Sequence, residues 1–162
     1  MQAKFTSYFL NEFSKSIREY LTRSSPDPRT IPQMTKFATM MADELYKGQL
    51  NIDMIHMTEF LLFVIERYGQ VMDSSQWTNL TVFTKQCMRC IFYCLAVLNG
   101  SQIDIEQSSS MLALCLNYRK LLFNPKILDV EQCKLLIHHI WAFVCSNDPD
   151  LTESAHDVCP SS

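Results

Sequence analysis

Residues 36–68 read KFATMMADELYKGQLNIDMIHMTEFLLFVIERY, and this stretch decides the fold class. In its first half, Phe37, Met41 and Leu45 recur every four residues, which is the spacing of one face of an α-helix. A glycine follows this pattern, as is common where a helix ends. In the second half, residues 60–65 are apolar on nearly all sides, which is typical of a helix with neighbours on several sides. The stretch therefore predicts two successive helices, of which the second is central.

Apolar residues at helical spacing continue on both sides of this pair. Only 3 of the 162 residues are glycine, so long helices with few turns of positive φ are expected. Thr30 with Gln33 is typical of a capping box at the start of the second helix. Six helices are predicted, over residues 2–23, 30–48, 52–72, 75–99, 103–123 and 129–146. The first is expected to bury one stripe, formed by Phe5, Phe9, Phe13, Ile17 and Leu21.

The spacing of these helices suggests how they are arranged. Helices that start near residues 2, 53 and 103 are about 50 residues apart, close to the period of armadillo and HEAT repeats. The predicted fold is all-α, with about six antiparallel helices that form either stacked HEAT-like hairpins or a compact bundle, since short connectors serve both. One domain is expected over residues 1–146. Residues 147–162 show no periodicity and are expected to form an acidic disordered tail.

The formal net charge of −3 belongs to that tail. Four of the 17 acidic residues lie in residues 147–162, which contain no Lys or Arg. The preceding residues therefore carry 13 acidic against 14 basic side chains. A nearly neutral body offers no basic field to gather nucleic acid or an anionic membrane, so neither is an expected partner.

Compartment is predicted from the N-terminal residues and the cysteines. The opening MQAKFTSYFLNEF lacks the apolar run of a signal peptide. The longest apolar run, from Cys90 to Leu98, is far shorter than the ~20 residues of a membrane span. Most of the seven cysteines lie in apolar helical patterns, as reduced buried thiols do. We therefore expect an intracellular, reducing location, cytoplasmic or nuclear, without membrane association.

Three cysteines form the most suggestive cluster for chemistry. Cys87, Cys90 and Cys94 share one side of a predicted helix, and a metal site would need further ligands such as Cys133 or the histidine pair at 138–139. Cys87 and Cys94 also occupy the apolar stripe of their helix, where a small thiol packs well. Core packing is the preferred interpretation, and a metal or redox protein is the less favoured alternative.

Signatures of catalysis are not found elsewhere in the sequence. His56 and Glu59 lie one helical turn apart, but no second such pair accompanies them, so a solvent-facing polar stripe is expected. Of the two adjacent histidines, His138 and His139, one must face outward. No glycine-rich phosphate loop, nucleophile elbow or HExxH motif occurs. The sequence therefore predicts a protein that is not an enzyme, with no catalytic residue, cofactor or metal.

Aromatic and basic residues outside the predicted core stripes are the candidates for partner binding. Aromatic and arginine side chains often anchor protein interfaces. A groove between adjacent helices could hold a partner helix or linear peptide. A stack of helical pairs also exposes apolar surface at its ends, which makes a homo-oligomer a further expectation. The predicted partner-binding residues are Tyr46, Trp77, Arg89, Tyr93, Arg119 and Lys120.

The opening stretch also resembles a known repeat. Phe37, the Glu44-Leu45-Tyr46 phrase, the turn at Gly48 and a new helix near residues 52–54 resemble the middle of a HEAT-type repeat in MIF4G-like domains. The resemblance covers about 33 residues, from 36 to 68. It implies a helical scaffold that binds peptides or other domains. It also raises the alternative of an RNA-metabolism or translation-associated adaptor, for which the basic residues near Arg119 would be the candidates.

Overall fold

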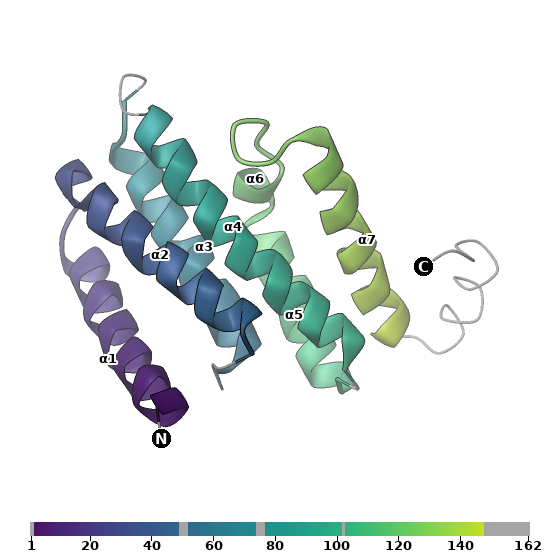
Figure 1. The fold of residues 1–162 in the computed structure, drawn as a ribbon. Coiled ribbons are helices and arrows are strands. Elements are labelled where there is room, and N and C mark those ends of the chain that lie inside the picture. Colours follow the sequence, from purple (N-terminus) through teal and green to yellow (C-terminus); the bar gives the residue numbers. More distant parts are fainter. Residues whose placement is uncertain (1, 49–51, 74–76, 102, 148–162) are drawn as a thin grey trace. The chain divides into compact units, whose positions relative to one another are not determined.

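A computed structural model describes residues 2–48, 52–73, 77–101 and 103–147, and this part of the chain is all-α, without a strand (Figure 1). Antiparallel packing of the helices confirms the predicted fold class. A short 3-10 helix, η1 (Pro28–Thr30), leads into the second helix. The α-helices of the described residues are α1 (Gln2–Arg23), α2 (Ile31–Tyr46), α3 (Met54–Val71), α4 (Trp77–Gly100), α5 (Ile105–Asn117), α6 (Arg119–Leu122) and α7 (Val130–Asn147).

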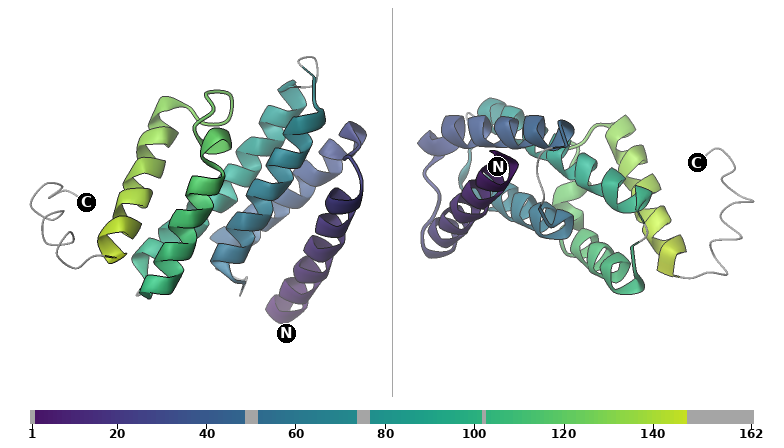
Figure 2. Two further views of the ribbon diagram at one scale, coloured as in Figure 1. Left: turned by 180° about the vertical axis from the view of Figure 1, so that it is seen from behind. Right: turned by 60° about the horizontal axis from the view of Figure 1, so that its bottom comes forward.

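The chain divides into two compact units, Met1–Cys94 and Leu95–Ser162, with the boundary inside α4. The first unit contains α1, α2, α3 and most of α4, and the second contains the end of α4 with α5, α6 and α7. In the second unit α5 and α7 lie side by side, as both views of Figure 2 show. The prediction of a single domain over residues 1–146 stays a prediction. The predicted disordered tail lies outside the described residues, apart from its first residue.

The buried face of α1 differs from the predicted stripe. Ile17 and Leu21 are buried as expected, but the third core position of the described side chains is Leu10. Phe9 is 50% exposed and Phe13 is 38% exposed. They are stacked on each other with ring centroids 5.9 Å apart. Leu10, Ile17 and Leu21, spaced by seven and four residues, share one helix face, and so do side chains spaced only by four. The sequence allows both patterns, and packing selects the first.

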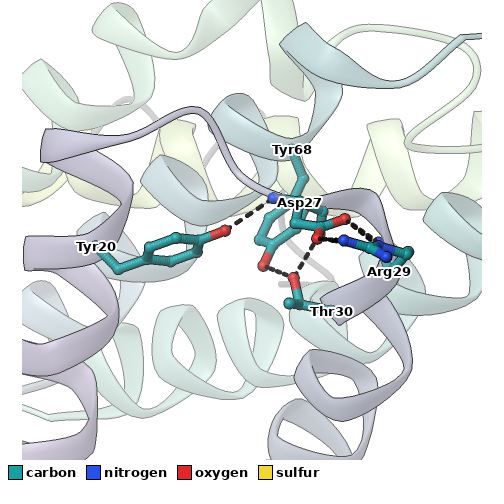
Figure 3. Close-up of polar contacts among 5 residues, drawn as sticks. All are labelled: Tyr20, Asp27, Arg29, Thr30 and Tyr68. Atoms are coloured by element: carbon teal, nitrogen blue, oxygen red, sulfur yellow. Dashed lines mark hydrogen bonds and ion pairs between the residues drawn. The ribbon is translucent and has the colours of Figure 1, made fainter.

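A polar cluster, shown in Figure 3, closes the junction between α1 and α2. The backbone N–H of Asp27 donates to the Tyr20 hydroxyl at 2.8 Å, and the Arg29 guanidinium pairs with the Asp27 carboxylate at 2.8 Å. That contact lowers the pKa of Asp27. Thr30 Oγ1 donates to the Asp27 carbonyl and lies 2.6 Å from the buried Tyr68 hydroxyl. The predicted capping box at Thr30 is therefore wrong: its hydroxyl is used to tie η1 to α3.

The core of the first unit follows the predicted stripes of α2, α3 and α4. Residues 60–65 of α3 are buried apart from Phe63, which confirms the central position of this helix. Tyr68 of α3 packs edge-on against Phe83 of α4, with centroids 5.8 Å apart. On α2, the buried side chains include Met34, Phe37, Met41 and Leu45. On α4, they include Leu80, Phe83, Cys87, Ile91 and Cys94.

In the second unit, one predicted helix is replaced by two. A capping box starts α5, with Asp104 accepting from the Gln107 N–H at 2.7 Å and the Gln107 side chain accepting from the Asp104 N–H. The helix then breaks at Tyr118, where φ is −104° and ψ is 20°, and restarts as α6. The expected cap of α7 is confirmed, because Asp129 and Gln132 make the same reciprocal pair of hydrogen bonds.

Helix α4 is long and apolar enough, over Thr78–Gly100, to cross a membrane by length and composition. Of the most apolar 18-residue segment of this helix, 50% is buried inside the protein. The core helix of a soluble protein has the same properties, so this observation does not decide the location, and the expected absence of a membrane span stays a prediction.

Candidate protein-interaction surfaces

Three of the six predicted partner-binding residues meet on the surface of α2 and α4. The rings of Tyr46 and Tyr93 pack edge to face with centroids 4.9 Å apart. The guanidinium of Arg89 lies over the Tyr46 ring, 5.7 Å from its centroid. Tyr46 is exposed, whereas Arg89 and Tyr93 are partly covered. We call these three residues the tyrosine–arginine cluster.

Polar neighbours fix the guanidinium of the tyrosine–arginine cluster. Arg89 Nη1 donates to Gln86 Oε1 at 2.7 Å, and Arg89 Nη2 lies 3.6 Å from the Asp43 carboxylate. A shallow hollow of about 370 Å³ lies along α2 beside Asp43, and Met40 and Lys47 also line it. An arginine whose guanidinium is already held by polar neighbours loses little further side-chain freedom when a partner covers it.

The other three predicted residues are not part of this cluster in the described structure. Trp77 is the first residue of α4, and its side chain lies outside the described part. Arg119 and Lys120 are exposed on α6 in the second unit. Arg119 Nη1 donates to the Leu116 carbonyl at 2.8 Å, so this side chain satisfies a backbone carbonyl at the end of α5. The basic group of the RNA-binding alternative, Arg119 and Lys120 with Lys126 and Lys134, is exposed. Positive charge at the C-terminal end of α5 is favourable without any ligand, which accounts for the first two of these cations.

A groove between α1 and α3 was not predicted. It encloses about 470 Å³, within the usual range for small ligands and peptide side chains. Buried Met57 and Phe60 contribute its apolar lining. The remaining lining residues are Asn11, Ser14, Lys15, Arg18, Ile52, Asp53 and His56. We call it the α1–α3 groove.

Charged groups around the α1–α3 groove are largely balanced. Arg18 forms a bidentate ion pair with Glu59, and its guanidinium lies 4.9 Å from the Phe63 ring centroid. Lys15 pairs with Glu12 at 3.2 Å. The Asp53 carboxylate accepts from the first backbone N–H groups of α3. The groove therefore favours apolar side chains over a strongly charged ligand.

One hydroxyl in the groove lining has no partner. Within the described structure, Ser14 Oγ is buried and makes no hydrogen bond. A buried polar atom without a partner costs about 1–3 kcal/mol, which a ligand carbonyl or amide could recover. Sequence reasoning missed the groove because its two walls come from residues more than 30 positions apart, and periodicity gives no information about such pairs.

The cysteine cluster proves to be part of the core. Cys87, Cys90 and Cys94 are fully buried, and the Cys90 thiol donates to the Ala38 carbonyl of α2 at 3.6 Å. Burial raises the pKa of Cys90 and of Cys94 to about 12, and that of Cys87 well above its usual value. Thiols with raised pKa values are poor nucleophiles. No three His, Cys, Asp or Glu side chains of the described residues gather at metal-binding distance.

In the second unit, the histidine pair is divided as expected. His138 is exposed, whereas His139 is buried, with its Nδ1 atom 2.8 Å from the Asn99 amide nitrogen of α4. An amide nitrogen can only donate, so His139 Nδ1 accepts and the ring is neutral with its proton on Nε2. Burial, and then the neighbouring His138, lower the pKa of His139.

This buried imidazole predicts a loss of stability in mild acid. Its pKa in the folded chain lies below the ordinary value of about 6.5, so below that pH the unfolded chain binds the extra proton. Stability should be complete above pH 6.5 and fall as the pH drops, with a slope of at most about 1.4 kcal/mol per pH unit. Urea unfolding at several pH values should show a shallower slope for His139→Gln. His56→Gln, at an exposed position of α3 in the first unit, is the control. An equal slope in wild type and His139→Gln would contradict the prediction.

No protein-family model, curated protein or solved structure matches this chain.

Proposed function

We infer that the chain is a non-enzymatic protein-interaction module that holds a partner helix or linear peptide in a groove between its helices. The observation that carries this proposal is the α1–α3 groove, with buried Met57 and Phe60 in its lining and polar residues around them. A groove of this kind accepts the apolar anchors of an amphipathic helix or extended peptide.

Three further features support this reading. Ser14 Oγ offers an unused hydrogen-bonding atom to the backbone of a ligand. Ion pairs hold both long cations of α1 that line the groove, which favours a partner recognised by apolar contacts. Catalysis is less favoured, because the three α4 thiols are buried with raised pKa values.

The tyrosine–arginine cluster provides a second contact surface within the same proposal. Tyr46, Arg89 and Tyr93 are of the residue types that carry much binding energy in interfaces. A HEAT-like scaffold and an intracellular, reducing location are also part of the proposal. Antiparallel helices and buried thiols support these two points without identifying a family.

The proposal can be tested with peptides selected from a phage-displayed random library on the full chain. Asn11→Trp should fill the mouth of the groove from an exposed position on α1 and weaken the selected peptides at least tenfold, about 1.4 kcal/mol. Ser16→Trp adds the same side chain at another exposed position of α1, outside the groove lining, and should leave affinity unchanged. Fluorescence polarisation of labelled peptides measures both.

Other outcomes distinguish the interaction function from its assignment to the α1–α3 groove. Peptides that lose affinity on Tyr46→Ala, but not on Asn11→Trp, would place binding at the tyrosine–arginine cluster and contradict the groove assignment. A selection that gives no peptide with a Kd below about 100 µM would contradict the interaction function itself.

A further inference from the structure

Both walls of the α1–α3 groove have the period of an α-helix. On α1, the lining residues Asn11, Ser14, Lys15 and Arg18 are spaced as i, i+3, i+4 and i+7, which is one helix face. Four lining residues from Asp53 to Phe60 repeat the same spacing at the start of α3. Seven positions along a helix rise about 10.5 Å. The groove is therefore about as long as two turns of a helix.

The two walls run in the same direction. Arg18 pairs with Glu59, and further along both helices Arg67 Nε donates to the Leu21 carbonyl at 2.9 Å. Side chains on both walls thus repeat every 5.4 Å or so along a common direction. A third helix packs into such rows because its own side chains have the same repeat. On one side of an extended peptide the side chains repeat about every 6.6 Å, so they do not keep register with the walls.

The walls also offer little to the backbone of an extended peptide. Backbone N–H and C=O groups of α1 and α3 bond within each helix, so neither wall has the free edge to which an extended peptide adds as a strand. Lys15 pairs with Glu12, Arg18 pairs with Glu59, and the Asp53 carboxylate accepts from N–H groups that start α3. An extended peptide would bury polar backbone groups without partners, which weakens binding, whereas a helix satisfies its own.

The same contacts determine the charge of a fitting partner. Both long cations of the lining already have a carboxylate partner, and backbone N–H groups hold the Asp53 carboxylate. Met57 and Phe60, in contrast, are buried apolar side chains. A charged anchor would lose its water without gaining an unpaired counter-charge. The complementary partner surface is therefore apolar and uncharged.

We propose that the segment held in the α1–α3 groove is an amphipathic helix with uncharged apolar anchors at i, i+4 and i+7, and not an extended peptide. Anchors at these positions lie on one face of a helix and span about 10.5 Å, the length of the walls. This assignment rests on the proposed function, which leaves the conformation of the partner open.

Proline substitution in the peptide tests the helix. The probes are peptides from the random library that lose affinity for the full chain on Asn11→Trp but not on Ser16→Trp. Proline at i+5, which faces away from the anchors, should weaken these peptides about a hundredfold, because it breaks a helix. Glycine at i+5 should weaken them about fivefold, and alanine, the matched control, should leave affinity unchanged. Fluorescence polarisation measures all three.

Chemical shifts and salt dependence test the conformation and the charge. When a ¹³C-labelled peptide binds the unlabelled full chain, its Cα signals from i to i+7 should move to the helical side of their random-coil positions. Raising NaCl from about 50 mM to about 300 mM should change the Kd by less than about twofold, because no charged anchor is screened.

Three results would overturn the assignment and leave the proposed function standing. These are a groove-dependent peptide that binds equally well with proline at i+5, bound Cα signals on the extended side, or a charged anchor whose replacement by leucine abolishes binding. A selection that gives no peptide sensitive to Asn11→Trp would instead remove the groove as the binding site, and the helical partner with it.

Discussion

Replacing Phe83 with alanine is expected to lower the free energy of unfolding by about 3–5 kcal/mol. The Phe83 ring is fully buried on α4 and contacts the buried Tyr68 ring of α3. Truncation removes the apolar surface of the ring and leaves a cavity that close-packed neighbours fill only in part. Because a domain of this size is stable by only about 5–15 kcal/mol, the variant should be close to unfolding.

Val82→Ala is the matched control for Phe83→Ala. Val82 precedes Phe83 on the same helix and is exposed, so its truncation should change stability by about 0.5 kcal/mol or less. Urea unfolding followed by circular dichroism gives both values from the shift in midpoint. Equal effects of the two substitutions would show that the face of α4 placed in the core is wrong.

The second large effect is expected in α7, where two adjacent leucines have opposite environments. Leu136 is 0% exposed and Leu135 is 45% exposed. Leu136→Ala should cost about 2–5 kcal/mol through lost burial and a cavity beneath α7. The same substitution at Leu135 should cost about 0.5 kcal/mol or less.

This pair is a strong test because the chemical change is identical at both positions. Differences in helix propensity and in the unfolded chain therefore cancel to a good approximation. Thermal or urea unfolding at low protein concentration, where association is negligible, measures the difference. A larger effect at Leu135 than at Leu136 would contradict the orientation of α7, in which Leu136 faces the core.

Much of the helical architecture could be predicted because one sequence property, the spacing of apolar residues, determines both helix and buried face. Met41 and Leu45 of α2 and Cys87 and Cys94 of α4 are buried as their spacing predicted. The cap of α7 at Asp129 was also predictable, because capping depends on residues three positions apart.

Features that depend on contacts between distant residues could not be predicted. Thr30 has the sequence signature of a helix cap, but its hydroxyl is hydrogen-bonded to that of Tyr68, 38 positions away. Leu10 replaces Phe9 and Phe13 in the core because packing between α1 and its neighbours selects that face. The break at Tyr118 has no glycine or proline to mark it.

The candidate surfaces show the same division. Tyr46, Arg89 and Tyr93 were predicted from residue type, and the structure brings them together across two helices. The α1–α3 groove needed the pairing of α1 with α3, which composition and spacing do not contain.

Because the thiols of α4 are buried, their chemical modification can report how often the core of the first unit opens. A thiol-specific alkylating reagent reacts with thiolate, and Cys87, Cys90 and Cys94 present almost none while the core is closed. Each modification therefore records an opening of α4 away from its neighbours. Mass spectrometry of the digested chain assigns each modification to a cysteine, and its rise over time at these three positions would time the openings in the wild-type chain.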